Sequence, residues 1–363
     1  MIRVCSEEEF AALVLGTAAY ATGGGGGKEE GYRLYREAFT SRGRCLELYS
    51  VDEVEGVIAS PYFLGAMGGR GFSGEKMLEA MKLYSRVVGI KLEGVIPVEL
   101  GAANTAVAYY IGEFMGVKCV DADRVGRAAP EIHQDTANIY GLKLTPSFIY
   151  AASGLAIVVH DYGSIDEYEA ISRSIASTLA SNILVVDAPL DASRLKRVAL
   201  TSTVSRALNT GLRVLEARRR GEDPVVALAE SMKGWIVFEG VVEEVSLRVS
   251  HGFLEGSITV RGVGDYYGHV LRSMVKNEHI AVWVDDKPLV LPPDLFTLVA
   301  EDGEPILNNE IRSGMRVLGV AAPAPDVWRS PRGLELFGPR RFGLEVNYTP
   351  VEVLVRKVDV PVR

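Results

Sequence analysis

Two short segments of the chain concentrate side chains that can move protons or hold an anion. The first is Glu99-Leu-Gly-Ala-Ala-Asn104, and the second runs from Asp121 to Asp135. Their carboxylates and histidine are suited to acid–base catalysis or to binding a divalent cation. Their amide and arginines can donate hydrogen bonds to oxygen atoms. The candidate residues are Glu99, Asn104, Asp121, Asp123, Arg124, Arg127, Glu131 and His133.

A single β-α-β unit would bring the two segments together. Leu92–Leu100 and Val117–Val120 are short apolar runs, which indicate buried strands. Between them, Gly101–Gly116 has the pattern of a helix, with Asn104 as its expected N-cap and Gly116 as its end. A right-handed crossover makes the strands parallel, so their carboxyl ends share the sheet edge where ligand crevices lie. The alternative is that the polar residues only cap and turn the chain around two strand ends.

Five consecutive glycines, Gly23–Gly27, separate two expected helices, Glu7–Ala21 and Glu29–Arg42. Such a run is entropically costly to order, so it needs a reason, and close approach of the backbone amides to a ligand is one. The run is not a Walker motif, because Lys28 is followed by glutamate. It is not a dinucleotide fingerprint either, because a helix and not a strand precedes it. A flexible exposed loop is the alternative. A second glycine-rich loop spans Gly65–Gly71.

The composition indicates a globular protein of two domains. The 363 residues exceed one ordinary core, and 48% of them are hydrophobic while 24% are charged. A net charge of -8 argues against a nucleic-acid partner, which requires clustered cations. We find neither an apolar run of about eighteen residues nor a signal peptide, so we expect a cytoplasmic protein that does not span a membrane. A single glutamine, Gln134, and more arginine than lysine favour a thermophilic source.

The three cysteines, Cys5, Cys45 and Cys119, are far apart in the sequence and include no Cys-x-x-Cys motif. Their odd number and their spacing indicate neither a disulfide framework nor a cysteine zinc site. Cys119 lies in an apolar strand, so we expect it to be a small core residue.

The pattern of expected elements changes near residue 189. Before it, strands and helices alternate; after it, a helical stretch over Ala192–Arg220 is followed mainly by strands. We therefore expect an α/β domain with βαβ units over residues 1–188 and an α+β domain with a mostly β core over residues 189–363. The strands expected in the second domain are Trp235–Leu247, Gly256–Val263, Ile280–Val284, Leu289–Leu291, Phe296–Val299 and Met315–Ala321.

Several motifs occur in a specific order along nearly the whole chain. They are the glycine run, Gly101-Ala-Ala-Asn-Thr, Val120-Asp-Ala-Asp-Arg-Val-Gly-Arg-Ala-Ala-Pro-Glu131, His251-Gly-Phe, Lys276-Asn-Glu-His, Pro293-Asp-Leu and Leu336-Phe-Gly-Pro-Arg-Arg-Phe-Gly343. This ordered set resembles the S-methyl-thiohydantoin desulfurase family, long catalogued as a domain of unknown function. The resemblance implies two domains, an α/β half and a β-rich half. It also implies hydrolysis of an S-methyl-thiohydantoin to a hydantoin with loss of methanethiol, and a link to hydantoinase and oxoprolinase systems.

The chain departs from the family pattern in two places. Ala102-Ala103-Asn104 stands where many relatives have Gly-Gly-Asn, and Lys28-Glu-Glu-Gly31 follows the glycine run where others often carry a proline. These departures leave room for a different substrate within the same scaffold.

The implied reaction needs a group that activates water, a group that holds the ring nitrogen, and donors to a ring carbonyl oxygen. Asp121 or Asp123 is the expected base, because carboxylates at a partly dry strand end have raised pKa values. Glu131 is a further catalytic candidate, and Arg127 or Arg124 would hold an anionic ring or carbonyl. Substrate contacts are expected from Gly24, Gly25, Gly26, Gly27, Glu99, Asn104, Arg124 and His133.

A divalent metal ion is the competing way to activate water. Its ligands would be Asp121, Asp123, Glu131 and His133, although their spacing matches no zinc-site signature. His251 and His279 lie in the family-like motifs of the second domain, and each could face a cleft between the domains. The expected partner is a small-molecule substrate. A homo-oligomer and a complex with a hydantoinase-type partner are both compatible with the sequence. The alternative function is a non-catalytic subunit of a hydantoinase or oxoprolinase-type enzyme.

Overall fold

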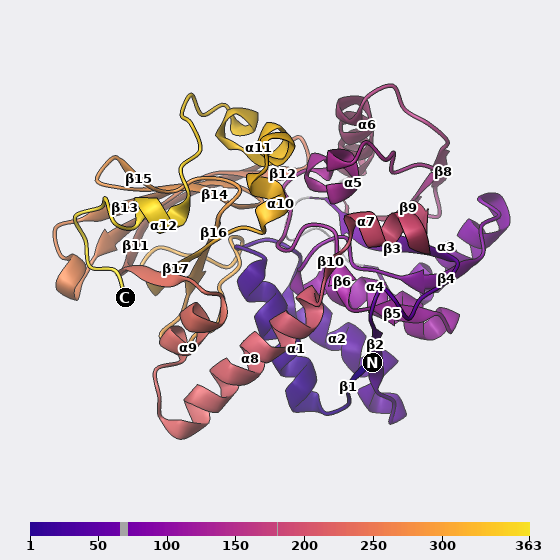
Figure 1. Cartoon of the computed structure of the whole chain (residues 1–363), viewed down its shortest axis with the longest axis horizontal. Coiled ribbons are helices and arrows are strands. Elements are labelled where there is room, and N and C mark those ends of the chain that lie inside the picture. Colours follow the sequence, from indigo (N-terminus) through magenta and orange to yellow (C-terminus); the bar gives the residue numbers. More distant parts are fainter. Residues whose placement is uncertain (66–71, 180) are drawn as a thin grey trace.

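The computed structural model describes residues 1–65, 72–179 and 181–363, and within them the chain is built on two β-sheets (Figure 1). The first half forms a mixed sheet of eight strands with helices packed against it, and the second half forms an antiparallel sheet of seven strands. The expected fold class, an α/β domain followed by a domain with a mostly β core, is confirmed.

The first sheet is parallel in its middle and antiparallel on both sides. Its strands lie in the order β1 (Ile2–Val4), β2 (Leu46–Tyr49), β5 (Lys118–Val120), β4 (Leu92–Val95), β3 (Val57–Leu64), β9 (Ile183–Asp191), β7 (Ser147–Ala151) and β8 (Ala156–Val159). Strands β2, β5, β4 and β3 run parallel. Their carboxyl ends therefore share one edge of the sheet, where a ligand site is expected.

Two successive β-α-β units build the parallel part. Strand β3 leads through α3 (Gly74–Val87) to β4, and β4 leads through α4 (Ala102–Met115) to β5. The unit β4–α4–β5 confirms the arrangement expected from the sequence. One detail of that expectation was wrong, because Gly101 and not Asn104 is the N-cap of α4. Asn104 lies within the first turn, so its side chain is free to reach neighbouring strands.

Helix α1 (Glu7–Tyr20) is largely buried because α2 (Lys28–Ala38), α4 and α8 (Thr203–Arg220) pack against it (Figure 1). Small residues allow α1 and α8 to lie very close together. A Cβ atom at Gly16 would come 1.7 Å from the carbonyl oxygen of Ala207. Helix α8, in the middle of the chain, therefore packs tightly against the first domain.

The continuous helix expected over Ala192–Arg220 is interrupted. The chain instead forms α7 (Ala192–Val198), the short strand β10 (Leu200–Thr201) and then α8. Strand β10 pairs with β6 (Ala122–Asp123), and Ser202, with a φ of 58°, turns the chain into α8. Tertiary pairing with the loop after β5 thus overrides the local helical pattern.

The second sheet is antiparallel throughout. Its strands lie in the order β15 (Lys287–Val290), β14 (Glu278–Val284), β13 (Val270–Lys276), β12 (Phe253–Gly262), β11 (Trp235–Ser250), β17 (Arg316–Ala322) and β16 (Leu295–Val299). The expected strands are confirmed. Strand β13 was missed, although its buried residues alternate with more exposed ones such as Arg272 and Lys276, which is the pattern of a half-buried strand.

Short helices complete both halves of the chain. They are α5 (Thr136–Ile139) and α6 (Ile165–Thr178) in the first half and α9 (Pro224–Ser231), which precedes β11 along the chain. The last three, α10 (Asp326–Arg329), α11 (Pro331–Phe337) and α12 (Val351–Leu354), follow β17. Across the residues that the structure describes, no helix is both long and apolar enough to cross a membrane.

The expectation of no disulfide was wrong, because Cys5 and Cys45 are bonded to each other. Strand β1 pairs antiparallel with β2, and the register places Val4 opposite Leu46. The two cysteines that follow and precede these residues therefore meet at the end of the ladder, although they are 40 residues apart in the sequence. Cys119 is a free, buried thiol, as expected.

Candidate functional site

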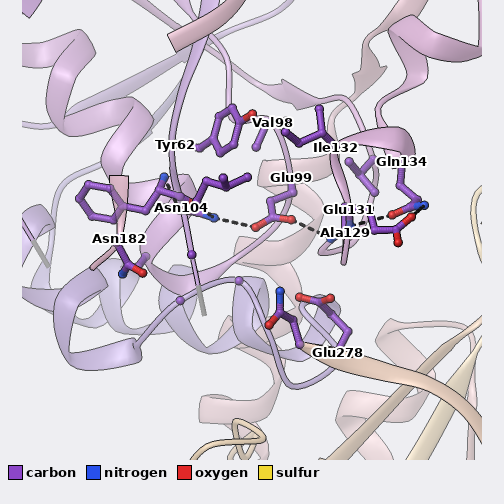
Figure 2. Close-up of a pocket in the computed structure, with 18 of the residues that line it drawn as sticks. Tyr62, Val98, Glu99, Asn104, Ala129, Glu131, Ile132, Gln134, Asn182 and Glu278 are labelled. Carbon is purple, nitrogen blue, oxygen red and sulfur yellow. Dashed lines mark hydrogen bonds between the residues drawn. The ribbon is translucent and has the colours of Figure 1, made fainter. Parts of the chain in front are cut away.

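A cavity of about 230 Å³ lies where the carboxyl ends of β3 and β4 meet the second domain. This volume suits a small molecule rather than a drug-sized one. From the first half, the cavity is lined by Gly25, Gly26, Gly27, Glu30, Tyr62, Phe63, Leu64, Gly65, Val98, Glu99, Ala103, Asn104, Val125, Ala129, Glu131, Ile132, Gln134, Asp135, Arg173 and Asn182. From the second half, it is lined by Asn277, Glu278 and Asn309. Figure 2 shows Glu99 in the middle of this group, with Tyr62, Val98 and Ile132 on one side and Glu278 on the other.

Glu99 is held rigidly in the cavity wall. Its Oε1 accepts a hydrogen bond of 2.7 Å from the Asn104 amide, and its Oε2 accepts one of 2.7 Å from the backbone N–H of Ala129 (Figure 2). Asn104 is itself fixed, because its side chain bonds both the N–H and the carbonyl oxygen of Phe63 in β3. Asn104 therefore positions Glu99 and has no donor left over for a ligand.

Burial raises the pKa of the Glu99 carboxyl to about 7, although the hydrogen bonds from Asn104 and Ala129 oppose the shift. A carboxyl that titrates near neutral pH is suited to take up and release protons. The two donors favour the charged form, so Glu99 is the better placed of the cavity carboxyls to act as a base.

Glu278, the first residue of β14, brings a second carboxyl to the cavity from the other domain. The side chain is buried, and its Oε2 has no hydrogen-bond partner among the described residues. Burial raises the pKa of this carboxyl well above its ordinary range, and the nearby charge of Glu99 raises it further. Glu278 therefore favours the protonated form, in which it can donate a proton.

The glycine run is ordered and forms part of the cavity wall. The carbonyl oxygen of Gly25 accepts hydrogen bonds of 3.2 Å from the amides of Ala103 and Asn104, so this loop caps the N-terminus of α4. A Cβ at Gly24 would come 1.9 Å from Oε1 of Glu278, and one at Gly25 would come 2.4 Å from the Cα of Gly101. The alternative of a flexible exposed loop is therefore wrong, since Gly23, Gly24 and Gly25 are buried.

The amides on the cavity side of this loop remain available. Within the described part of the chain, the amides of Gly25, Gly26 and Gly27 make no backbone or side-chain hydrogen bond. All three residues line the cavity. Residues 66–71 of the second glycine-rich loop lie outside the described residues.

The two aspartates expected to act as the base do not line the cavity. Oδ1 of Asp121 accepts a hydrogen bond of 2.8 Å from the amide of Ser205 in the first turn of α8. Oδ2 of Asp123 accepts hydrogen bonds from the amides of Val125 and Gly126, and burial raises the pKa of this carboxyl to about 6. Both side chains thus shape the loop after β5 and its contact with α8.

The two arginines of this loop are fully buried and also lie behind the cavity wall. Arg124 forms ion pairs of 3.0 Å with Asp135 and with Asp187. Arg127 bonds backbone carbonyls and the hydroxyl of Thr22, and it reaches from the first domain to the second. Neither guanidinium is among the groups that line the cavity.

Glu131 lines the cavity but is already neutralised. Lys276 and Arg341 of the second domain both pair with it, and despite burial they lower the pKa of this carboxyl to about 2. His133 lies outside the cavity lining, and its ring nitrogens contact Asp166 and Arg341. These two residues therefore join the domains at the rim of the cavity.

Other candidate residues also have structural partners. His251 lies in the turn between β11 and β12 and contacts the Ser250 hydroxyl. His279 is buried against Ser273, and desolvation together with the charge of Arg127 lowers its pKa to about 3. Among the described residues, no group of three or more His, Cys, Asp or Glu side chains is arranged to hold a metal ion.

Sequence reasoning missed several polar residues that line the cavity, among them Arg173, Glu278 and Asn309. Arg173 bonds Glu169 and the carbonyl oxygens of Gly65, Pro130 and Gly252, so it braces the wall from behind. Glu278 carried a signal, since it is the third residue of the family-like motif Lys276-Asn-Glu-His. In that motif, the neighbouring His279 and not Glu278 was assigned to the cleft.

The fold and the cavity together define a two-domain protein with a carboxyl-lined cavity where an α/β domain meets a β domain. The chain belongs to the S-Me-THD-like family: residues 8–161 match the model of its N-terminal domain, and residues 164–351 match that of its C-terminal domain.

The same fold occurs in a crystal structure of a protein from Chromobacterium violaceum determined by the Northeast Structural Genomics Consortium. That structure superposes with a TM-score of 0.78 at 20% sequence identity, over 97% of this chain and 100% of the other. No curated protein matches the chain.

Proposed function

We propose that the protein is a hydrolase that converts an S-methyl-thiohydantoin into a hydantoin and methanethiol. The observation that carries this proposal is the pair of buried carboxyls, Glu99 and Glu278, which the two domains contribute to one small cavity. The family name supplies the class of substrate, and the cavity supplies groups suited to the reaction.

The reaction places water on the ring carbon that carries sulfur. The water oxygen bonds to this carbon, the carbon–sulfur bond breaks, and the sulfur leaves with a proton as methanethiol. Glu99 takes the proton from the attacking water, because its two hydrogen-bond donors stabilise the charged form. Glu278 gives its proton to the departing sulfur or to the adjacent ring nitrogen. Two carboxyls that share one proton are a known solution to this need.

The glycine run supplies the expected contact to the ring carbonyl. Gly25, Gly26 and Gly27 line the cavity and their amides make no hydrogen bond within the described part of the chain, and such fixed donors stabilise developing negative charge on oxygen. Tyr62, Val98 and Ile132 form an apolar wall opposite Glu278, which suits the methylthio group or a ring substituent (Figure 2).

The test is thiol release from a panel of S-methyl-thiohydantoins, followed with a thiol reagent, with hydantoin detected in parallel. Glu278→Gln should abolish turnover, whereas Glu244→Gln, the same change on an exposed part of β11, should not. Asp121→Asn should retain turnover, because its carboxylate binds α8 and lies outside the cavity.

Absence of thiol release from every ring, with divalent metals also supplied, would contradict the proposal. A stable complex with a hydantoinase-type subunit, without turnover by the free chain, would instead support the alternative of a non-catalytic partner. Loss of turnover in Asp121→Asn but not in Glu278→Gln would overturn the assignment of the acid–base residues.

A further inference from the structure

Arg127 is a buried cation with no carboxylate of its own. Its guanidinium lies in the loop after β6 and is fully buried, 5.0 Å from the ring centre of Phe337. Its N–H groups donate to neutral acceptors, namely the carbonyl oxygens of Ala128 (3.1 Å), Pro293 (2.7 Å), Asp294 (2.8 Å) and His279 (3.5 Å), and the hydroxyl of Thr22 (2.8 Å). Among the described residues, no carboxylate oxygen lies within 4.0 Å of this guanidinium.

A buried charge without compensation is expensive, so negative charge must lie nearby. Arg127 lies beside the pair Glu99 and Glu278, because its carbonyl oxygen accepts a hydrogen bond of 3.3 Å from the amide of Leu100 and its guanidinium reaches the carbonyl oxygen of His279. The carboxyls whose charges act on Arg127 are those of Glu278, Asp294 and Glu99. Asp294 is already neutralised by Arg329, which pairs with it at 2.6 Å. The remaining negative charge available to Arg127 is that of the pair Glu99 and Glu278.

Other cations near the Glu99–Glu278 pair already form ion pairs with other carboxylates. Arg173, which lines the cavity, pairs with Glu169 at 2.8 Å, so its charge, which also lowers the pKa of Glu99 and of Glu278, is shared with that carboxylate. Lys276, two residues before Glu278, pairs with Glu131. His279, beside Glu278, is neutral above its lowered pKa of about 3.

Two further acidic residues that line the cavity, Glu30 and Asp135, pair with Arg33 and Arg124. Asp123 is a buried acidic neighbour behind the wall. Its carboxyl acts on Glu99 from behind the wall and is held by two backbone amides. A further negative charge at this place favours protonation of the pair, which opposes the influence of Arg127. Among the described residues of this buried region, Arg127 is thus a cation without a carboxylate partner, and Glu99 and Glu278 are the two carboxyls that compete for it.

We propose that Arg127 is the counter-ion of the Glu99–Glu278 pair and holds that pair at a net charge of -1, without touching the substrate. Without this cation, the first ionisation of the two buried carboxyls would move to higher pH, and a smaller fraction of the molecules would hold a base near neutral pH. With it, one carboxyl loses its proton while the other keeps it, which is the state that acid–base chemistry requires. The effect on turnover rests on the proposed function, but the effect on ionisation does not.

Arg127 also fixes the geometry of the pair, because it joins parts of both domains. It bonds Thr22 directly before the glycine run, and it bonds Pro293 and Asp294 in the second domain. The test must therefore separate loss of charge from loss of these hydrogen bonds. Arg127→Lys retains the charge but loses most of the bonds, and Arg127→Met loses both.

The experiment is a titration of the full-length chain carrying glutamate labelled with ¹³C at the side-chain carboxyl. Glu99→Gln and Glu278→Gln assign the two resonances. In Arg127→Met, the first ionisation of the pair should move up by about one to three pH units, which is the usual effect of removing an adjacent opposite charge. In Arg127→Lys, it should stay within about half a unit of the parent protein.

Turnover provides the second measurement. In Arg127→Met, the apparent pKa of the acid limb of the kcat/KM profile should increase together with the pKa measured from the carboxyl resonance. In Arg127→Lys, this apparent pKa should not change. If Arg127→Met does not fold, the double variant Arg127→Met/Glu99→Gln should recover stability, because it removes the cation together with the carboxyl that carries the negative charge of the pair.

A folded Arg127→Met with an unchanged titration would overturn the proposal, as would a double variant that remains as unstable as the single one. Because the titration needs no substrate, it also separates this proposal from the proposed function. A shifted ionisation without any thiol release would support the counter-ion and contradict the hydrolase.

Discussion

Substitution of Gly24 by alanine tests whether the position of the Glu278 carboxyl determines activity. The backbone at Gly24 is not in the left-handed region, so alanine can adopt its conformation without strain. The added Cβ would lie 1.9 Å from Oε1 of Glu278, whereas an ordinary contact is at least 3.4 Å. The carboxyl must therefore retreat by about 1.5 Å, and it can do so because it ends a flexible side chain.

Misplacement of a reacting group by about 1 Å can cost about 100-fold in rate. We therefore expect Gly24→Ala to lower kcat/KM by about 100-fold, equivalent to about 2.7 kcal/mol in activation free energy. The melting temperature should change by no more than a few degrees, because no backbone atom is displaced. Thiol release measures the first quantity, and thermal unfolding measures the second.

The matched control is the same substitution in the Glu278→Gln background. If Gly24 acts through Glu278, the two changes are not additive, and alanine at position 24 should alter the residual rate by less than about threefold. Full activity of Gly24→Ala would refute this reasoning. So would an equal loss in both backgrounds, since the effect would then not pass through the carboxyl.

Three further predictions follow from other contacts. Gly25→Ala should destabilise the fold by about 1–3 kcal/mol in urea unfolding, because Gly25 has a φ of 71° and its Cβ would meet Gly101; a neutral result would restore the flexible-loop interpretation. Because the native pKa of Glu99 is raised to about 7, the folded state binds this proton more tightly than the unfolded state. Stability should therefore fall as pH rises from about 4.5 to 7, and Glu99→Gln should flatten that part of the unfolding curve. Serine at both Cys5 and Cys45 should lower the free energy of unfolding by about 4 kcal/mol, as the chain-entropy model gives for a separation of 40 residues, and identical urea midpoints would contradict it.

The architecture of the first domain was predictable because its signals are local. An apolar run, a helix ending at Gly116 and a second apolar run define β4, α4 and β5 without help from distant residues. The right-handed crossover then identifies the sheet edge that carries a ligand site. Glu99 and Asn104 were assigned to that edge, and both line the cavity.

The orientation of residues at this edge was not predictable in the same way. Asp121 and Glu99 both follow parallel strands, so the sequence pattern does not separate them. Only the docking of α8, whose Ser205 amide binds Asp121, turns that carboxylate away from the cavity. The assignment of a base thus depended on a contact between segments far apart in the sequence.

The residue that the second domain contributes to the cavity was not predictable either, because it too depends on a contact between distant segments. Glu278 begins a strand in a different sheet, and no local periodicity relates it to Glu99. The disulfide was missed because β1 is only three residues long, too short to give a strand signal, although its register brings Cys5 to Cys45. In each case the missing information is long-range pairing, not residue chemistry.

The division of the carboxyl pair between two domains bears on how such a site persists in evolution. A gene that encodes one domain alone supplies Glu99 or Glu278, but not both, so under the proposed function neither half would have an activity of its own to preserve. Selection for turnover would then act on the surface that joins the halves as strongly as on the two carboxyls. Contacts such as those of Glu131 with Lys276 and Arg341, which an exchange of domains between relatives would break, should be inherited together with the site.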